Sequence, residues 1–246
     1  MKNNSLTEFY EADADRFWNP RHGMVGRDLT IYPLLKNFSG NVLEYGAGSG
    51  SLLLSLALDD RFKSLVGVDI SNIALQKIAE AWNDMAKIHS KSLDKLTLIA
   101  PVDDALPAVP SNSVDVILSL DTIEHVLNPY TVLDELYRVS KPEGIFIISV
   151  PNYGYIKHVV QLLRGRQPVT GGGEAVEHWR TAGWDGWHLH TFTRESLNAL
   201  LLDCGWQPTL WTGYGDKGKW FGLEILRRKF PAFWSGALTV VCRRIP

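Results

Sequence analysis

Three alternate glycines and two acidic residues form the pattern in this chain that most clearly predicts a chemical role. An apolar run ends at Glu44 and is followed by Gly46, Gly48 and Gly50. Nineteen residues after the last glycine, a second apolar run ends at Asp69. Glycines at a strand-to-helix turn allow positive φ and a close approach of the backbone to a ligand, and an acid at the next strand end can accept both hydroxyls of a ribose. The pattern therefore predicts a nucleoside cofactor.

The spacing of the glycines distinguishes two classes of nucleoside. A dinucleotide site needs G-x-G-x-x-G, with its helix N-terminus facing a pyrophosphate, but Ser51 stands at the third glycine place. The loop E-x-G-x-G-x-G instead resembles the first motif of the class I S-adenosylmethionine-dependent methyltransferases. The resemblance implies that Glu44 recognises the cationic methionine part of the cofactor, whereas a carboxylate would repel a pyrophosphate. It also implies that Tyr45 and Ala47 line the cofactor with the three glycines.

The stretch Gly67-Val68-Asp69-Ile70-Ser71 is similar to the second motif of that family. By this resemblance Asp69 holds the ribose hydroxyls and Ile70 packs on the adenine. The alternative for Asp69 is a helix N-cap before Asn72, which is a common role of Asp. We expect the ribose role, because the strand end, the distance along the chain and the first motif agree.

A third element, Val102-Asp103-Asp104-Ala105-Leu106-Pro107, resembles the D-x-x-x-L-P segment of the ubiquinone/menaquinone-type small-molecule methyltransferases. In that branch the acid bonds the adenine amino group. Here the acid lies one residue nearer to Leu-Pro, so either Asp103 or Asp104 can be the residue that matches the family's acid. We favour Asp103. The alternative is a pair of solvated turn carboxylates.

The segment S-L-D-T-I-E-H-V-L-N-P after the expected fourth strand is similar to the L-E-H-V-x-D-P segment of the same branch. We expect Ser119 and Leu120 to line the methionine portion, since open α/β sheets bind ligands outside the carboxyl ends of their strands. His125 is a candidate contact to the acceptor substrate. Alternatively, Glu124 and His125 only hydrogen-bond backbone across the turn. The segment lacks the N/D-P-P-Y/F tetrapeptide of relatives that methylate adenine or glutamine amides, which argues against those substrates.

Two histidines are candidates for acid–base catalysis. The stretch from His188 to Leu197 resembles the H-x-x-x-F-T-x-x-x-L segment of the same small-molecule group, and His188 matches its leading His. Methyl transfer to a phenol or enol oxygen gains from a base that titrates near neutrality, so His188 and His190 are the candidates. Both can instead satisfy backbone groups at a helix entrance. Transfer from a sulfonium depends chiefly on in-line positioning, and many such enzymes need no strong base.

Aromatic residues crowd the stretch after the fifth expected strand. Trp179, Trp184 and Trp187 lie within nine residues, and Tyr153 follows the strand itself. One interpretation is an aromatic-walled pocket for a planar or apolar acceptor, to which Tyr153, Trp184 and Trp187 contribute. The other is core packing or simple cover over the site. Arginines of this stretch either bind an acceptor carboxylate or phosphate or stay solvated: Arg164, Arg166 and Arg180.

Composition limits the class of protein. The 246 residues, 45% hydrophobic and 21% charged, fit one α/β domain with a sizeable core. A net charge of -2 argues against a dedicated nucleic-acid binder. Cys204 and Cys242 lie far apart and outside any metal-ligand spacing, so we expect neither a disulfide nor a metal site. No apolar signal region or membrane-spanning run is found. We expect a cytoplasmic monomer or homodimer that acts on a small molecule.

The alternation of β-branched runs with helical periods predicts βαβ units. We expect strands at 41–45, 65–70, 96–100, 114–120, 144–150, 207–212 and 237–242. One helix is expected to cover the sheet with an apolar face that steps by three and four: Ala74, Ile78, Ala81, Met85 and Ile88. Asn128-Pro129 starts another helix, and Thr193 caps a third that Gly205 ends. The resemblance implies a Rossmann-like, mostly parallel sheet flanked by helices, with order 3-2-1-4-5-7-6 and the last strand antiparallel.

We expect one methyltransferase domain over residues 1–246. Its parts are a helical cap (1–38), a cofactor-binding half (39–150), a lid and substrate insertion (151–192), and a C-terminal helix with strands six and seven (193–246). The run from Lys219 to Arg228 has three interpretations: an amphipathic helix on a membrane, a dimer contact, or the helix between strands six and seven, which we favour.

The expected reaction moves a methyl group from S-adenosylmethionine to an O, N or C atom of a small aromatic or apolar metabolite, leaving S-adenosylhomocysteine. One rival is a catalytically idle S-adenosylmethionine-binding sensor or partner protein, since fold alone does not guarantee function. The other is an NAD- or nucleotide-sugar-dependent Rossmann enzyme, which Ser51 and Glu44 disfavour.

Overall fold

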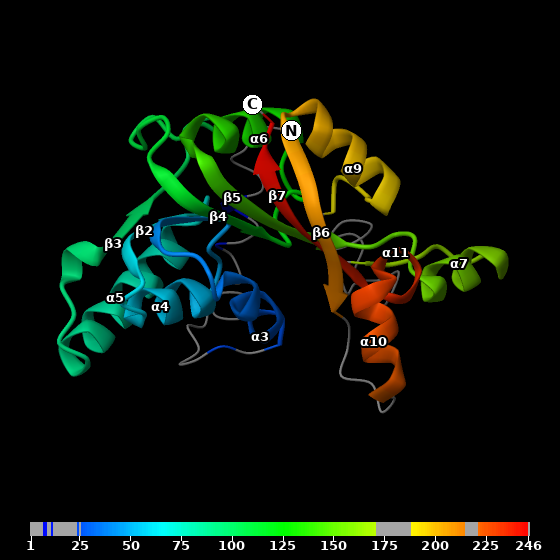
Figure 1. Cartoon of the computed structure of the whole chain (residues 1–246), viewed down its shortest axis with the longest axis horizontal. Helices are drawn as coiled ribbons and strands as arrows, with labels where there is room; N and C mark the ends of the chain where they lie inside the picture. The colour runs from blue at the N-terminus through cyan, green and yellow to red at the C-terminus, as the bar shows by residue number, and fades with distance from the viewer. Residues whose placement is uncertain are drawn as a thin grey trace. The chain divides into compact units, whose positions relative to one another are not determined.

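The computed structural model of this chain describes residues 26–170, 188–214 and 221–245, together with the isolated positions Thr7, Glu8, Glu11 and Met24. Its strands form a seven-stranded sheet in the order β3-β2-β1-β4-β5-β7-β6 (Figure 1). This order and the antiparallel pairing of β6 with β7 confirm the predicted fold. The strands are β1 (Gly40–Tyr45), β2 (Phe62–Val68), β3 (Leu96–Ile99), β4 (Val114–Leu120), β5 (Ser140–Pro151), β6 (Trp206–Tyr214) and β7 (Ala237–Arg244).

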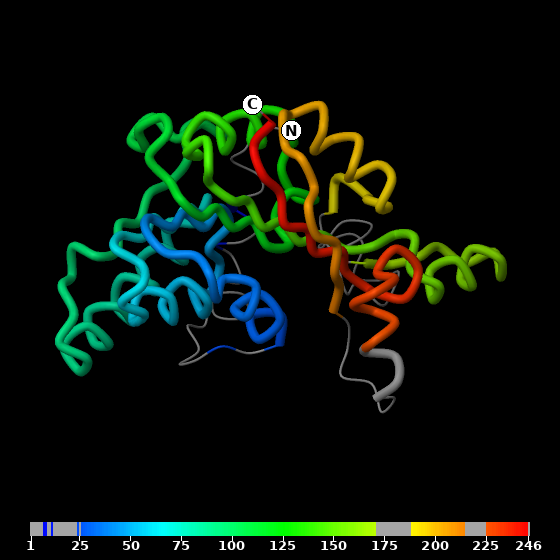
Figure 2. The backbone as a smooth tube through the Cα atoms, in the orientation of Figure 1, coloured from blue at the N-terminus to red at the C-terminus, as the bar shows by residue number. Residues whose placement is uncertain are grey.

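Helices connect the strands, and the path of the chain between them can be followed in Figure 2. Among the described helices, none is both long enough and apolar enough to cross a bilayer. They are α3 (Asp28–Ile31), η1 (Tyr32–Leu35), α4 (Ser51–Leu58), α5 (Asn72–Ile88), η2 (Leu93–Lys95), α6 (Pro129–Val139), α7 (Ile156–Leu163), α9 (Arg194–Asp203), α10 (Phe221–Lys229) and α11 (Pro231–Trp234). The segment between β6 and β7 therefore contains the predicted helix.

The predicted helix ends are confirmed. Asn128 Oδ1 accepts a hydrogen bond from the backbone N–H of Tyr130 at 3.1 Å, in the first turn of α6. Thr193 caps α9 and forms a capping box with Ser196. Gly205 follows α9 with a φ of 78°, a conformation that favours glycine after a helix.

The buried face of α5 differs from the prediction. Ala74, Ile78 and Met85 are buried as expected, but Trp82 and Ala86 are buried in place of Ala81 and Ile88. Ile88, the last helical residue, is 75% exposed. The Trp82 ring occupies the core because its Nε1–H finds a partner, the carbonyl of Leu93 at 3.1 Å. The expected position of Ile88 in the core was therefore wrong.

The chain packs as two compact units, each with its own core. The first comprises Met1–Ser119 and Glu135–Ile145, and the second comprises Leu120–Asp134 and Phe146–Pro246. In the second unit Trp206 is fully buried, its ring lies 4.8 Å from that of Phe146, and its Nε1–H donates to the carbonyl of Leu133 at 3.3 Å.

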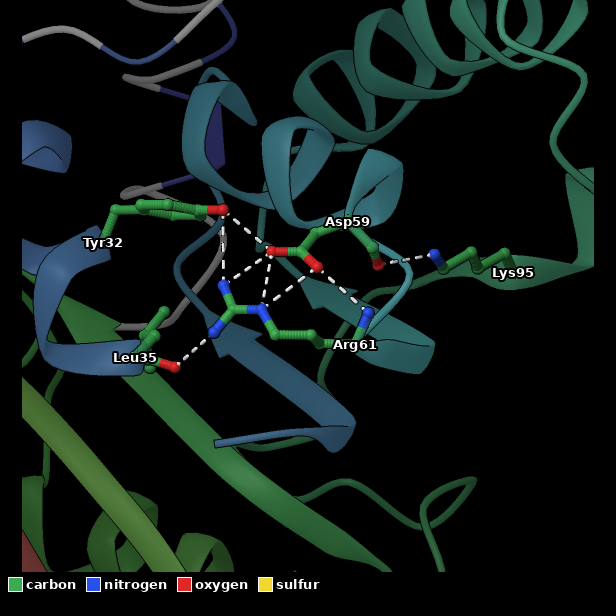
Figure 3. A network of polar contacts seen from close by, with 5 residues as sticks. All are labelled: Tyr32, Leu35, Asp59, Arg61 and Lys95. Carbon is green, nitrogen blue, oxygen red and sulfur yellow. Dashed lines mark hydrogen bonds and ion pairs between the residues drawn. The ribbon is translucent and has the colours of Figure 1, made fainter. Parts of the chain in front are cut away.

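A charged network joins several elements of the first unit (Figure 3). The guanidinium of Arg61 donates to Oδ2 of Asp59 through Nη2 at 2.6 Å and through Nε at 3.0 Å, and its Nη1 donates to the carbonyl of Leu35 at 2.8 Å. Tyr32 donates to the same carboxylate, and Lys95 donates to the backbone carbonyl of Asp59. These bonds tie η1 and η2 to the loop that enters β2.

Candidate functional site

The glycine loop begins where β1 ends and leads into α4. Gly46, Gly48 and Gly50 have φ values of 78°, 54° and 70°, a region that L side chains rarely adopt. A Cβ on Gly50 would also lie 2.8 Å from Cγ1 of Ile78 in α5. Positive φ and close packing therefore both require glycine at position 50.

Asp69 follows β2 and holds the glycine loop. Its Oδ2 accepts the backbone N–H of Gly48 at 2.8 Å, and its Oδ1 accepts that of Ser71 at 2.9 Å. Burial raises the pKa of Asp69. The N-cap of α5 is Ser71, whose hydroxyl accepts from Ala74 N, so the N-cap alternative for Asp69 was wrong. The Asp69 carboxylate retains acceptor capacity that a ribose hydroxyl can use.

Glu44 is buried near the end of β1, and its Oε2 has no hydrogen-bond partner among the described residues. Burial raises the pKa of Glu44 to about 8 against a lowering by Arg27, and nearby Asp28 and Asp69 add to the rise. A buried polar atom without a partner is unfavourable unless a ligand supplies one. A cationic group fits this position.

Ser119 lies beside β1, because β4 runs parallel to it with Ser119 opposite Tyr45. Its buried hydroxyl also lacks a partner within the described part of the chain. Glu44 and Ser119 thus leave polar atoms unsatisfied at the carboxyl end of neighbouring parallel strands, which is where open α/β sheets bind ligands. Leu120, the next residue, is buried.

Asp103 and Asp104 form a tight turn with φ values of 50° and 66°, closed by backbone hydrogen bonds between Val102 and Ala105. Tyr45 donates from its hydroxyl to Oδ1 of Asp104 at 3.4 Å, while Asp103 is exposed. Burial raises the pKa of Asp104 and of Tyr45. The contact links Asp104 to Tyr45, the last residue of β1 before the glycine loop. That Asp103 or Asp104 binds the adenine amino group stays a prediction. Ile70 is partly exposed directly after Asp69.

A second group of candidate residues gathers in the second unit around Glu124. The buried backbone carbonyl of Glu124 accepts the N–H groups of Leu189 at 2.7 Å and His190 at 3.1 Å. This places Nε2 of His188 4.0 Å from Oε1 of Glu124, and Nδ1 of His188 hydrogen-bonds the Thr170 hydroxyl at 2.7 Å. The His188 ring therefore lies beside the buried side chain of Glu124.

His125 joins this group, since its ring lies 4.7 Å from that of His188 in an edge-to-face arrangement. His190 is placed differently, because its Nε2 donates to the carbonyl of Val126 at 3.0 Å. Tyr153 donates its backbone N–H to the carbonyl of Phe192. Trp179, Trp184 and Trp187 lie outside the described residues.

Glu124, His125 and His188 each offer a ligand atom, and these atoms lie within 4.8 Å of one another. A carboxylate with two imidazoles is a donor set that Zn²⁺ accepts. The expectation that the chain has no metal site therefore stays a prediction. The sequence predicts Glu124 only as a backbone support. Its side-chain position beside His188 depends on the fold of a segment 64 residues away.

Comparison with known proteins identifies relatives. The methyltransferase domain family matches residues 16–210. The mitochondrial ubiquinone biosynthesis O-methyltransferase of Dictyostelium discoideum is 29% identical over 63% of this chain and 56% of its own length. A probable S-adenosylmethionine-dependent methyltransferase of Mycobacterium tuberculosis is 27% identical over 58% of this chain and 45% of its own length. The chain thus spans about half the length of the curated relatives it matches.

Solved structures share the fold at low sequence identity. The 4+2 cyclase SpnF superposes with a TM-score of 0.66 at 16% identity, over 100% of this chain and 97% of that one. At this identity the likeness establishes the architecture alone, and the name of that neighbour shows that one fold hosts more than one reaction.

Proposed function

Since this chain belongs to the methyltransferase domain family and has the class I S-adenosylmethionine-dependent fold, we propose that it transfers a methyl group from S-adenosylmethionine to a small acceptor. The observation that carries the proposal is the buried, unpartnered Oε2 of Glu44 beside the glycine loop. An ammonium or sulfonium cation favours the ionised carboxylate and satisfies this oxygen, whereas a pyrophosphate would be repelled by the ionised form. The same cofactor accounts for both acids at this site, Glu44 near the end of β1 and Asp69 directly after β2.

Each cofactor contact has a residue in the first unit. Glu44 and Ser119 receive the methionine part, Asp69 the ribose, and Asp104 or Asp103 the adenine amino group, with Ile70 against the ring. Tyr45, Ala47 and the glycine backbone line the path between them. Leu120, the residue after Ser119, stays a candidate for the methionine end. Positioning of the sulfonium methyl for in-line attack then supplies most of the rate acceleration.

We propose that the acceptor loses a proton during transfer and that His188 takes it. The acceptor atom forms a bond to the methyl carbon, the carbon–sulfur bond breaks, and its electron pair stays on the sulfur of S-adenosylhomocysteine. Nε2 of His188 receives the acceptor proton, while Nδ1–H donates to Thr170 and Glu124 stabilises the imidazolium. His125 and Tyr153 are the described candidates for contact with the acceptor.

A phenolic or enolic hydroxyl fits this arrangement best, because such an oxygen becomes a stronger nucleophile when a base removes its proton. The name of the Dictyostelium relative, an O-methyltransferase of ubiquinone biosynthesis, supports a small aromatic or apolar acceptor. We retain N and C acceptors as alternatives to be tested in the same panel.

Calorimetric titration of the purified chain tests the cofactor first. We expect micromolar binding of S-adenosylmethionine and S-adenosylhomocysteine, no binding of NAD, and loss of binding in a Glu44→Ala, Asp69→Ala double variant. A Glu80→Ala, Asp84→Ala variant changes two solvent-facing acids of α5 and serves as the matched control. Binding of NAD, or equal binding by both double variants, would contradict the assignment.

A protein that binds the cofactor without transferring its methyl group is the second candidate, favoured by the likeness to a cyclase. A panel of phenols, enols and amines distinguishes the two. Formation of S-adenosylhomocysteine with any member supports methyl transfer. Cofactor binding with no turnover across the panel supports the second candidate.

A further inference from the structure

The helix α7 buries a polar residue and exposes apolar ones. Five of its eight residues, in the sequence IKHVVQLL, are Ile, Val or Leu, yet His158 is its one buried residue. Leu162 is 50% exposed and Leu163 is 82% exposed. A helix on a water-facing surface normally has the opposite arrangement.

Polar contacts at the start of α7 fix this orientation. Nδ1 of His158 hydrogen-bonds the carbonyl of Asn152 at 3.0 Å. The buried side chain of Asn152 in turn donates to the carbonyls of Pro231, Ala232 and Ser235 at 2.8–3.1 Å. These bonds pin the beginning of α7 to α11, so the outward position of its leucines is built into the second unit.

The helices α10 and α11 contact each other and lie side by side in Figure 1. Both elements also expose apolar side chains. Ile225 is 62% exposed, Phe230 is 60% exposed and Phe233 is 42% exposed. Exposed large apolar groups concentrated on connected elements indicate an interaction surface rather than ordinary scatter.

Cations outnumber acids on the same elements. Residues 156–166 contain three Lys or Arg and no Asp or Glu, and residues 221–235 contain three Lys or Arg and one acid, Glu224. The exposed cations are Lys157, Arg164, Arg166, Arg228 and Lys229. Exposed apolar side chains accompanied by exposed cations are complementary to an anionic headgroup layer above hydrocarbon.

We propose that α7 and α10–α11 form a membrane-docking surface for an anionic lipid bilayer. We define this surface by its apolar members Leu162, Leu163, Ile225, Phe230 and Phe233 and by the five cations just named. Phenylalanine and leucine enter the boundary between headgroups and acyl chains, while lysine and arginine stems extend to the lipid phosphates. Docking is peripheral and reversible, and it is independent of the reaction proposed above.

Co-sedimentation of the full chain with vesicles tests the proposal. We expect at least about tenfold stronger binding to phosphatidylcholine vesicles that contain phosphatidylglycerol than to phosphatidylcholine alone, with weakening as salt rises. A Leu163→Ser, Phe230→Ser variant is expected to lose this binding. An Ile88→Ser, Leu93→Ser variant changes two exposed apolar residues of the first unit and is expected to keep it.

A charge variant gives a second readout that does not depend on the apolar substitutions. Arg164→Gln with Lys229→Gln is expected to reduce the preference for anionic vesicles severalfold, whereas Lys87→Gln on the exposed side of α5 is not. Cofactor binding and the thermal midpoint confirm that each variant is folded.

Three results would overturn the proposal. Equal or no binding to the two vesicle types excludes an anionic bilayer. If soluble glycerol phosphate, at the same concentration as the lipid, displaces the protein from the vesicles, the cations form a site for free phosphate. A dimer that Leu163→Ser, Phe230→Ser dissociates, without vesicle binding, assigns the surface to a second copy of the chain.

Discussion

The hydroxyl of Tyr214 donates a hydrogen bond of 2.6 Å to Oδ2 of Asp121 and so joins the end of β6 to the turn that follows β4. Asp121 has a φ of 53°, and Ser149 donates to its other carboxylate oxygen at 3.0 Å. Its backbone N–H also donates to the carbonyl of Ser149 at 2.8 Å. Several bonds therefore hold a left-handed residue at the start of the segment that carries Glu124.

Tyr214→Phe removes the hydroxyl that donates to Asp121 and leaves the Asp121 carboxylate with one hydrogen-bond donor fewer. We expect a loss of about 1–3 kcal/mol in the free energy of unfolding, since bonds to charged groups lie in that range. Denaturant unfolding measures it. Tyr130→Phe, which changes an exposed tyrosine of α6, is the control and is expected to have little effect. An equal loss in both variants would contradict a special role for the Asp121 bond.

Glu44 is expected to release a proton when the cofactor binds. Its pKa of about 8 leaves the free protein protonated there at pH 7, while a cation beside the carboxylate favours ionisation in the complex. The complex then binds fewer protons than the free protein, so cofactor affinity increases as pH rises towards 8 and levels off above it. Calorimetry at pH 7 in buffers of different ionisation enthalpy is expected to report close to one proton released.

The Glu44→Gln variant is expected to release almost no proton and to lose the rise in affinity with pH. Asp69→Asn serves as the comparison, because burial also raises the pKa of Asp69. If Glu44→Gln releases as many protons as the native chain and Asp69→Asn releases none, the released proton comes from Asp69 and the assignment to Glu44 is wrong.

The strands and the glycine loop were predictable because their signals are local. The run Val114–Leu120 is a β-branched apolar segment between turn residues, and its observed bounds match the prediction. Strand β5 begins earlier than expected, at Ser140 instead of Gly144, because Lys141 pairs with Asp115 of β4 at 2.7 Å. A charged Lys-Pro-Glu stretch suggests a loop unless the partner across the sheet is known.

The acceptor side was less predictable because its geometry depends on distant contacts. Glu124 and His188 approach each other through backbone bonds to Leu189 and His190, which no short motif encodes. The left-handed conformation of Asp121 likewise depends on Ser149 and Tyr214.

His188 and His190 are expected to differ in their effect on turnover. With an acceptor identified from the panel, His188→Asn should lower kcat about 10²–10⁴-fold while leaving cofactor Kd unchanged, because a positioned base contributes in that range. The deficit should shrink at high pH, where the acceptor hydroxyl ionises without help. His190→Asn removes a bond to the Val126 carbonyl and should lower stability more than kcat.

The same assay separates a base from a metal ligand. A chelator is expected to leave the rate of the native chain unchanged if His188 acts as a base. Loss of activity that added Zn²⁺ or Mg²⁺ restores would instead assign Glu124, His125 and His188 to a metal.

The bonds between Arg61 and Asp59 are expected to govern acid stability of the first unit (Figure 3). Burial alone would raise the pKa of Asp59, but hydrogen bonds from Arg61 and Tyr32 outweigh it and lower the pKa to about 2. A carboxyl with a lowered pKa contributes stability above its unfolded value of 3.8, and this contribution is lost as pH falls towards 2.

Asp59→Asn is therefore expected to destabilise the protein by about 1–3 kcal/mol at pH 7 and to flatten the decline of stability between pH 4 and pH 2. Unfolding midpoints measured across this range provide the test. Asp60→Asn is the neighbouring control, because Asp60 is exposed and its pair with Lys91 is screened by solvent and salt. A steeper acid decline in Asp59→Asn than in the native chain would contradict the assignment, since the variant has no carboxyl at position 59 left to titrate.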